Sequence, residues 1–343
     1  MIWFDLDNSP HVPLFRPIFK ELSKRNLQYF ITARKYAQTV DLLKLWDIEF
    51  ELVGKHGGKS KIKKVANLFH RAYQLGKCIR GKNIKLAVSH GSRSQLLTAK
   101  TKGVNSILMM DYEYTERRIF NLLSTYLLIP KIIPDERLML AGINLQKVIR
   151  YNGFKEDLYI NDFIPEKDFR KIIRVEEEEV LIVIRPPGML GNYHDRKSER
   201  LFLSAIQYFL NLNNTVCLIV NRTKSEREFS INNFELSKKL RFLEKPVDGL
   251  QLLYCADICL SGGGTMNRES ALLGTKTYSI FTGKRPYLDE HLQSIGKLKF
   301  IETESDIEEI SVSKIEKTYQ PFTSNNLIEE IADIIESKYI QSI

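Results

Sequence analysis

Short apolar runs alternate along the chain with stretches in which apolar residues recur every three or four positions. The runs are typical of β-strands, and we predict strands at 2–6, 28–32, 86–89, 106–110, 180–184, 215–220, 257–260 and 277–281. Most of these runs are apolar at every position, as parallel strands are when helices cover both faces of their sheet. Between them, the spacing of Phe15, Ile18 and Leu22, and later of Phe202 and Ile206, is that of one helix face. The alternation predicts a doubly wound α/β fold.

The pattern starts again in the middle of the chain, which predicts two domains. A charged stretch after Pro165 ends in four glutamates at 176–179, and a new buried strand follows at Val180. We place one Rossmann-like domain at 1–155 and a second at 165–320, in keeping with a length of 343 residues. The remaining segment, 321–343, has apolar residues at helical spacing and is predicted to be an amphipathic helix.

Composition narrows the class of protein. Apolar residues make up 43% of the chain and charged residues 27%, which excludes a disordered or collagen-like protein. The four cysteines are too few for a disulfide scaffold and lack the partners of a zinc site, so we expect free thiols in a reducing compartment. The N-terminus does not resemble a signal peptide, and no run reaches the ~18 apolar residues of a spanning helix. We expect a cytoplasmic protein that at most touches the inner face of the membrane.

Positive charge is concentrated in the first half of the chain. The net charge is +9, yet residues 1–150 contain 26 Lys and Arg against 12 Asp and Glu. The segment from Lys55 to Lys85 contains ten Lys and Arg and no acid. Such a field attracts anions: phosphorylated substrates, acidic lipid headgroups or nucleic acid. No nucleic-acid-binding signature accompanies the charge, so nucleic acid is not expected as a partner, and a solvated basic helix without any partner is the alternative.

Four polar residues follow the first predicted strand directly: Asp7, Asn8, Ser9 and His11. In an open α/β sheet, ligands collect at the carboxyl ends of the strands. Histidine accepts protons near neutral pH, and aspartate can orient it or substitute for it. His11 and Asp7 are therefore candidate catalytic residues, and Asn8 and Ser9 are candidate acceptor-side residues; a simple turn is the alternative. Asp5 lies inside the strand, away from that edge, and we predict no metal site.

Two further predicted strands of the first domain are followed by polar loops. His90 and Arg93 follow the strand at 86–89, and Asp111 and Glu113 follow the strand at 106–110. The same edge rule makes them candidates for the same site. Asp111 and Glu113 are the next candidates for a catalytic base, and His90 and Arg93 are placed on the acceptor side.

A glycine turn follows the strand at 257–260 in the second domain. Its residues are Ser261, Gly262, Gly263, Gly264, Thr265 and, one helical turn later, Glu269. Glycines let backbone N–H groups approach an anion, and a helix N-terminus favours phosphate. Glu269 could accept hydrogen bonds from ribose hydroxyls. The segment is neither a Walker loop nor a dinucleotide fingerprint, and a plain tight turn is the alternative to phosphate binding.

Arg185 ends the first strand of the second domain, and a loop runs from it to His194. A guanidinium at this edge could bind a diphosphate through two parallel hydrogen bonds. Arg185 is therefore a candidate nucleotide-binding residue. The alternative is an ion pair with the glutamates at 176–179.

These segments resemble an uncharacterised GT-B-like family, a domain of unknown function from archaeal and bacterial surface-polysaccharide loci. The resemblance covers nearly the whole chain and rests on WFDLDNSPHV from Trp3, HGS from His90, SGGGTMNRESALLG from Ser261 and YSIFTGK from Tyr278. It implies two Rossmann-like domains that face each other across a cleft, with the C-terminal helix packed back on the N-terminal domain. The implied ligand is a nucleotide-diphosphate sugar, held by the C-terminal domain.

The chain is more distantly similar to the N-acetylglucosaminyltransferase that forms lipid II and to the UDP-N-acetylglucosamine 2-epimerases. In both relatives a glycine-rich turn and a helical glutamate hold the diphosphate and the ribose, a pattern that the turn at 262–264 and Glu269 match. Ser9-Pro10-His11 stands where the transferase has Gly-Gly-His, and the epimerases' Gly-Thr-Arg-Pro-Glu segment is missing here. The second departure favours the transferase.

The leading hypothesis is a metal-independent glycosyltransferase that needs no cofactor. It would transfer a sugar from a UDP-sugar or other nucleotide-diphosphate sugar to an anionic, lipid-linked acceptor in surface polysaccharide or glycan synthesis. A UDP-sugar 2-epimerase-like isomerase and a non-catalytic nucleotide-sugar-binding protein are the alternatives, since a fold does not by itself determine a function.

Overall fold

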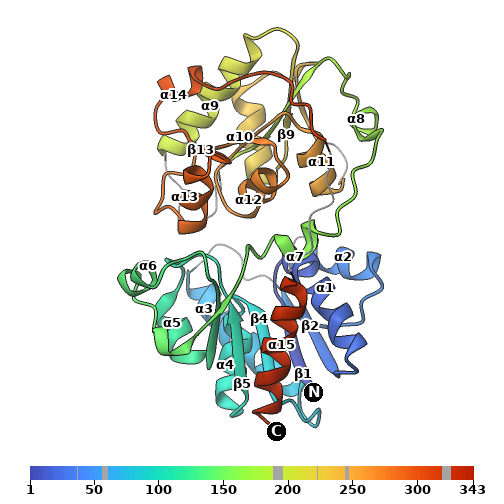
Figure 1. The fold of residues 1–343 in the computed structure, drawn as a ribbon, viewed down its shortest axis with the longest axis vertical. Coiled ribbons are helices and arrows are strands. Elements are labelled where there is room, and N and C mark those ends of the chain that lie inside the picture. Colours follow the sequence, from blue (N-terminus) through green and yellow to red (C-terminus); the bar gives the residue numbers. More distant parts are fainter. Residues whose placement is uncertain (37, 56–60, 188–195, 222, 244–246, 319–325) are drawn as a thin grey trace. The chain divides into compact units, whose positions relative to one another are not determined.

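The computed structural model describes the chain except for residues 37, 56–60, 188–195, 222, 244–246 and 319–325 (Figure 1). The chain forms two compact units. The first comprises Met1–Asn161, Pro286–Leu288 and Thr323–Ile343, and the second comprises Asp162–Arg285 and Asp289–Phe322. Each unit contains one parallel sheet packed against helices, so the predicted pair of Rossmann-like α/β domains is confirmed.

The first unit has a seven-stranded sheet in the order β3-β2-β1-β4-β5-β6-β7, with parallel pairing throughout. Its strands are β1 (Ile2–Leu6), β2 (Tyr29–Lys35), β3 (Glu51–Lys55), β4 (Leu86–His90), β5 (Asn105–Met109), β6 (Tyr126–Pro130) and β7 (Val148–Tyr151). Its helices are α1 (His11–Lys24), α2 (Thr39–Leu45), α3 (Lys61–Cys78), α4 (Arg93–Thr101), α5 (Arg117–Leu123), α6 (Asp135–Leu140), the 3₁₀ helix η1 (Leu145–Lys147), α7 (Asp157–Ile160) and α15 (Leu327–Ile340).

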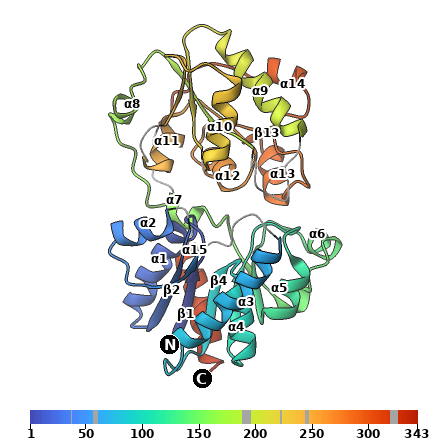
Figure 2. The same ribbon diagram turned by 180° about the vertical axis from the view of Figure 1, so that it is seen from behind.

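β1 runs through the middle of this sheet and is buried on both faces. Phe4 packs against Phe15 and Phe19 of α1, with ring centroids 5.4 and 4.9 Å away. Trp3 points to the opposite face, where it packs with Leu75 of α3. Figure 1 shows α1 and α15 on the first face, and Figure 2, drawn from behind, shows α3 and α4 on the other. Two helical layers explain why β1 is apolar at almost every position.

The C-terminal helix α15 packs on the first unit. Its apolar side joins the core formed by β1 and α1 through Leu327, Ile331 and Ile335. Its polar side is tied to the end of α1, because Arg25 donates hydrogen bonds to Asp333 at 2.5 Å and to Glu336 at 3.0 Å. The predicted return of this helix to the N-terminal domain is confirmed.

The second unit has a six-stranded parallel sheet in the order β10-β9-β8-β11-β12-β13. Its strands are β8 (Val180–Arg185), β9 (Thr215–Ile219), β10 (Leu240–Phe242), β11 (Ile258–Ser261), β12 (Lys276–Ser279) and β13 (Leu298–Phe300). Its helices are α8 (Phe169–Ile172), α9 (Arg196–Leu210), α10 (Lys224–Asn233), α11 (Gly249–Cys255), α12 (Thr265–Leu272), α14 (Ser305–Glu308) and, from Asp289 onwards, α13 (Tyr287–Ser294). Its core packs α9 against β8, β9 and β11.

The eight strands predicted from the apolar runs all coincide with observed strands, with ends that differ by three residues or fewer. Sequence reasoning missed β3, β6, β7, β10 and β13. Four of these lie at the edges of the two sheets, where a strand is paired on one side alone and is less apolar. Among the helices in the described ranges, none has both the length and the apolar composition to cross a membrane.

Candidate functional site

In each sheet the strand order reverses beside the first strand. β1 lies between β2 and β4, and β8 lies between β9 and β11. Ligands of open α/β sheets bind at the carboxyl ends of the strands next to such a switch point. The residues predicted from the sequence follow β1, β4 and β5 in the first unit, and β8 and β11 in the second.

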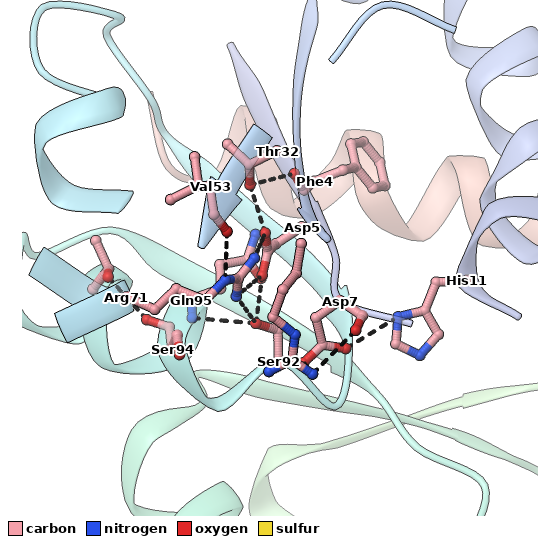
Figure 3. A network of polar contacts seen from close by, with 12 residues as sticks. Phe4, Asp5, Asp7, His11, Thr32, Val53, Arg71, Ser92, Ser94 and Gln95 are labelled. Carbon is pink, nitrogen blue, oxygen red and sulfur yellow. Dashed lines mark hydrogen bonds and ion pairs between the residues drawn. The ribbon is translucent and has the colours of Figure 1, made fainter. Parts of the chain in front are cut away.

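Asp7 and His11 are in contact at the carboxyl end of β1. Asp7 follows the strand directly and His11 is the first residue of α1, with His11 Nδ1 3.4 Å from Asp7 Oδ1 (Figure 3). Arg34 of β2 also holds Asp7: its Nη2 donates to the Asp7 carbonyl at 3.1 Å and lies 3.5 Å from Oδ2. An imidazole oriented by a carboxylate in this way can act as a general base.

His90 and Asp111 form a second pair on the neighbouring strands. His90 ends β4, and its Nε2 lies 3.3 Å from Oδ1 of Asp111, which follows β5 closely. The other carboxylate oxygen of Asp111 accepts a hydrogen bond from Lys155 Nζ, which also lies 3.4 Å from a carboxylate oxygen of Glu156. Asp111, Lys155 and Glu156 are all buried. One buried cation therefore lies between two buried carboxylates.

The two pairs form one cluster. The His11 and His90 rings lie with their centroids 5.2 Å apart and their planes inclined by 50°. The fold thus brings together Asp7, His11, His90 and Asp111, which are up to 104 positions apart in the chain. Two Asp–His pairs side by side can take up a proton at one atom and release one at another.

Burial shifts the pKa values of two members of the cluster, His11 and Asp7. It lowers the pKa of His11 well below the ordinary value of 6.5, and electrostatic interactions with His90 and Lys155 act in the same direction. Burial also raises the pKa of Asp7, and Arg34 and Arg71 offset that rise only in part. At neutral pH His11 is therefore held in the neutral form, the form of imidazole that can accept a proton.

Asn8 and Ser9 make local contacts in the turn between β1 and α1. The Asn8 side chain accepts a hydrogen bond from the Ser9 N–H at 3.0 Å. Ser9 Oγ accepts one from the N–H of Gln38 at 2.9 Å. These contacts shape the turn, and the acceptor-side role of both residues stays a prediction.

Arg93 and Glu113 each form an ion pair outside the two histidine pairs. Arg93 lies 2.8 Å from Glu116. Glu113 is fully buried and accepts a hydrogen bond from Arg137 Nε at 2.9 Å. A carboxylate held this way neutralises a neighbouring cation, and its role as a base stays a prediction.

A buried ion pair lies beneath this edge (Figure 3). Arg71 of α3 donates to Asp5 from both terminal nitrogens, at 2.7 and 2.8 Å, and from Nε to the Val53 carbonyl of β3 at 2.9 Å. The hydroxyls of Ser92 and Thr32 donate to the same carboxylate at 2.5 and 2.6 Å. Burial opposes ionisation of Asp5, yet Arg71 and these hydrogen bonds hold its pKa below the ordinary value. The pair links β1 to β2, β3, α3 and the N-cap of α4.

The glycine turn between β11 and α12 is exposed at its tip. Gly264 is exposed and caps α12, which begins at Thr265, without a side-chain hydrogen bond. Gly263 and Gly264 have φ angles of +95° and +85°, which L side chains rarely adopt. At Gly262 an added Cβ would lie 3.2 Å from the Cα of Pro187. Glycine is therefore required by the backbone at this turn.

The residues around the turn differ in what they can offer a ligand. Ser261 is fully buried, and its hydroxyl contacts Asn267 and accepts a hydrogen bond from the Gly263 N–H at 3.2 Å, so it shapes the turn. Arg185 is the last residue of β8 and pairs in register with Ser261. Glu269 is half-buried, one helical turn into α12. The predicted loop residues 188–195, with His194, lie outside the described residues.

The described residues include no group of three or more His, Cys, Asp or Glu side chains placed to hold a metal ion. The cysteines Cys78, Cys217, Cys255 and Cys259 are free. Burial raises the pKa of Cys217, Cys255 and Cys259 to about 12. These thiols are therefore unreactive at neutral pH.

Sequence reasoning missed two cations at the carboxyl ends of the strands in the first unit. Lys155 comes after β7, a strand that was not predicted, and Arg34 lies in the part of β2 beyond the predicted end at residue 32. Both residues stand near the carboxyl ends of strands. The edge rule would have found them if the strand limits had been recognised.

Comparison with known proteins gives a family and one curated relative. A family model described as "Protein of unknown function (DUF354)" matches residues 1–338. The uncharacterized protein MJ0665 of Methanocaldococcus jannaschii is 27% identical over 322 residues, which cover 90% of this chain and 89% of that protein.

Solved structures share the fold over nearly the whole chain. The UDP-GlcNAc 2-epimerase of M. jannaschii, in complex with UDP-GlcNAc and UDP, has a TM-score of 0.76 at 15% identity, covering 98% of this chain and 99% of that chain. S. aureus MnaA, solved with UDP, has a TM-score of 0.78 at 13% identity, covering 100% and 97%. At these identities the likeness shows the fold alone, and it confirms the predicted GT-B-like architecture.

Replacing Arg71 tests the buried ion pair. Arg71→Met is expected to lower the free energy of unfolding of the first unit by about 3–5 kcal/mol, because it leaves the Asp5 carboxylate buried without its cation. Lys24→Ala, which removes an exposed cation from its ion pair with Glu21, should change this free energy by less than about 0.5 kcal/mol. Urea unfolding followed by circular dichroism measures both. A loss in Arg71→Met no larger than that in Lys24→Ala would contradict this reading.

Acid titration adds a second readout for the same pair. Because the pKa of Asp5 is lower in the folded chain than its ordinary 3.8, the pair's stabilisation is complete above that pH and is lost as the pH falls through the folded pKa. The stability difference between the wild type and the double variant Asp5→Asn/Arg71→Met should therefore change across the acid range. A difference independent of pH there is the opposing result.

The charge state of His11 can be measured without an activity assay. NMR titration of its imidazole is expected to give a pKa below 6.5. Lys155→Gln should raise that pKa, because it removes one of the positive charges that lower it, whereas Lys24→Gln should leave it unchanged. A His11 pKa at or above 6.5, or one that ignores Lys155→Gln, would show that the ring is not held as described.

Proposed function

The chain belongs to the DUF354 family, and we propose that it is an enzyme that binds a nucleoside diphosphate sugar at the glycine turn of its second unit. The glycine turn carries this proposal. It stands at the switch point of the sheet, is exposed at Gly264, and opens a helix of eight residues. The first N–H groups of a helix have no partner within it, and the helix dipole adds partial positive charge. A diphosphate has the charge and the acceptor oxygens that such a turn binds.

Two side chains next to the turn complete the proposed nucleotide site. Arg185 pairs in register with Ser261, so its guanidinium starts from the strand beside the turn and can contribute charge-assisted hydrogen bonds to the diphosphate. Glu269 lies one turn into α12 and would accept hydrogen bonds from the ribose hydroxyls. The solved neighbours that hold UDP or UDP-GlcNAc share this fold, which supports UDP as the first nucleotide to test.

The proposed reaction is transfer of the sugar to an acceptor hydroxyl. His11, oriented by Asp7, would take the hydroxyl proton as the acceptor oxygen attacks the anomeric carbon. The bond between that carbon and the diphosphate oxygen breaks, and the nucleoside diphosphate leaves with both bonding electrons. The backbone N–H groups of the turn and Arg185 would stabilise the leaving charge, so the proposal needs no metal ion and no cofactor. It assigns proton transfer to the first unit and diphosphate binding to the second.

The charge of the chain supports an anionic acceptor. Lys and Arg exceed Asp and Glu by 14 over residues 1–150, which contain the His11 cluster. A positive field of this size attracts an acceptor that carries a phosphate or diphosphate group.

A sugar-nucleotide 2-epimerase is the second candidate, and the names of the solved neighbours are the reason to keep it. The M. jannaschii structure described above is a UDP-GlcNAc 2-epimerase that matches 98% of this chain. Two adjacent Asp–His pairs would suit a reaction that removes a proton and returns one. An epimerase needs no acceptor, and that requirement separates the two candidates.

Nucleotide affinity tests the second unit. Glu269→Ala and Gly262→Ala are expected to weaken UDP binding by about tenfold or more, the first by removing a hydrogen-bond acceptor and the second by pushing the turn away from Pro187. Isothermal titration calorimetry with UDP gives the dissociation constants.

The matched controls are Glu308→Ala, an exposed glutamate, and Gly249→Ala, where an added Cβ meets nothing within 4 Å. Both should bind UDP like the wild type. Unchanged affinity in Glu269→Ala and Gly262→Ala would reject the assignment of the turn.

Turnover tests the first unit. His11→Asn is expected to reduce kcat about 10²–10⁴-fold with little effect on UDP affinity, because it removes the base and leaves the glycine turn intact. His70→Asn, an exposed histidine of α3, is the control and should keep full activity. A His11→Asn enzyme that turns over normally would remove His11 from the mechanism.

One assay distinguishes the two reactions. The enzyme is incubated with UDP-GlcNAc alone and with UDP-GlcNAc plus polyprenyl-diphosphate-linked sugars, and the products are followed by NMR. Release of UDP that depends on the added lipid supports transfer, and conversion of UDP-GlcNAc without it supports epimerisation. No change in UDP-GlcNAc or any other UDP-sugar, with or without lipid, would contradict the enzymatic proposal.

A further inference from the structure

The outward face of α3 carries an apolar stripe. Val65, Phe69 and Tyr73 follow one another at four-residue intervals, and their exposed fractions are 58, 59 and 62%. At a rise of about 1.5 Å per residue, the stripe is about 12 Å long. Aromatic and branched side chains of this size usually turn towards the core of a surface helix.

A different face of α3 is buried against the sheet. Ala72 and Leu75 pack towards the sheet with Ile79, which follows the helix, and Arg71 makes the buried ion pair with Asp5. The helix therefore cannot rotate to bury Val65, Phe69 and Tyr73 without breaking that ion pair. Figure 2 shows α3 on the outside of the sheet, next to α4.

The surroundings of the stripe are positively charged. Residues 52–110, which include α3 and α4, contain thirteen Lys and Arg and no Asp or Glu. Lys77 continues the stripe by a further four positions, and its Nζ lies 4.7 Å from the centroid of the Tyr73 ring. Arg80 follows α3, and Lys100 and Lys102 lie at the end of α4; all are exposed.

We propose that this face of α3 docks on the surface of an anionic lipid bilayer. The ring of Phe69 and the side chain of Val65 would enter the boundary between headgroups and acyl chains, and the Tyr73 hydroxyl would stay among the headgroups. The exposed Lys and Arg side chains would contact acidic headgroups. Three apolar side chains bury little area, so binding depends on apolar contact and charge together.

Charge also distinguishes the bilayer from other partners of an apolar stripe. A second copy of the chain, applied to the same face by twofold symmetry, would bring two surfaces rich in Lys and Arg together, and like charges would repel. A nucleic acid would satisfy the cations but gives Val65 no apolar environment. An acidic bilayer satisfies both the charge and the stripe.

Vesicle binding of the full chain tests the proposal. Sedimentation with vesicles of equimolar phosphatidylcholine and phosphatidylglycerol is expected to show binding, and pure phosphatidylcholine vesicles are expected to bind at least about tenfold more weakly. Phe69→Ser/Tyr73→Ser and Lys77→Glu/Arg80→Glu should each weaken binding to the mixed vesicles at least about tenfold. Raised salt should weaken the binding of the wild type as well.

The controls change equally exposed residues elsewhere on the first unit. Leu140→Ser, at a side chain that is 85% exposed, and Lys24→Glu, also exposed, should bind mixed vesicles like the wild type. An unchanged melting temperature shows that each variant is folded, and it keeps the result independent of the proposed function.

Four results would overturn the proposal. The first is equal binding to both kinds of vesicle or to neither. The second is full binding by the Phe69→Ser/Tyr73→Ser variant. The third is that the wild type self-associates without lipid, as seen by light scattering, and the Phe69→Ser/Tyr73→Ser variant does not; the stripe would then bind a second copy of the chain. The fourth is that the wild type binds single-stranded RNA as tightly as it binds mixed vesicles and this variant loses that affinity; the stripe would then bind nucleic acid.

Discussion

The ion pair between Asp5 and Arg71 is the interaction on which the first unit depends. Both side chains are buried, so neither charge is tolerable without the other, and every strong donor around Asp5 is used to offset the loss of water. The contacts come from β1, β2, β3, α3 and the cap of α4, which are distant in sequence. The Asp5 carboxylate, two residues before Asp7, therefore helps to hold α3 and the start of α4 on the sheet.

The candidate catalytic residues lie next to this ion pair, at the carboxyl ends of the strands. Asp7 and His11 sit at the end of β1, and His90 and Asp111 at the ends of the next two strands, so the ion pair and the sheet together bring the two rings to 5.2 Å. Burial then acts oppositely on the two residue types: it keeps His11 neutral and makes Asp7 harder to ionise. The same layer fixes the inward side of α3, which leaves Val65, Phe69 and Tyr73 facing outwards.

Both units have a parallel sheet whose strand order reverses beside its first strand. They differ in the residues that follow the strands at this switch point. The first unit places ionisable side chains there. The second places glycines there, and their backbone adopts positive φ at Gly263 and Gly264. Side chains suit proton transfer and bare backbone suits phosphate, which is the physical basis for dividing the proposed roles between the units.

The sequence by itself determined the class of fold, because strand and helix periodicity is local: eight of the nine inner strands, together with α1, α9 and α15, can be recognised from the spacing of apolar residues. It also indicated the polar residues at strand ends, since the edge rule needs only the order of elements. The edge strands were not predicted, because they are short and less apolar. Since β7 was not predicted, Lys155, which follows it, was not recognised as a site residue. Only the tertiary structure decided that Arg71 would be buried against Asp5, that His11 would meet His90, and which side of α3 would stay exposed. Each of these contacts joins residues far apart in the chain, and no local pattern encodes such a contact.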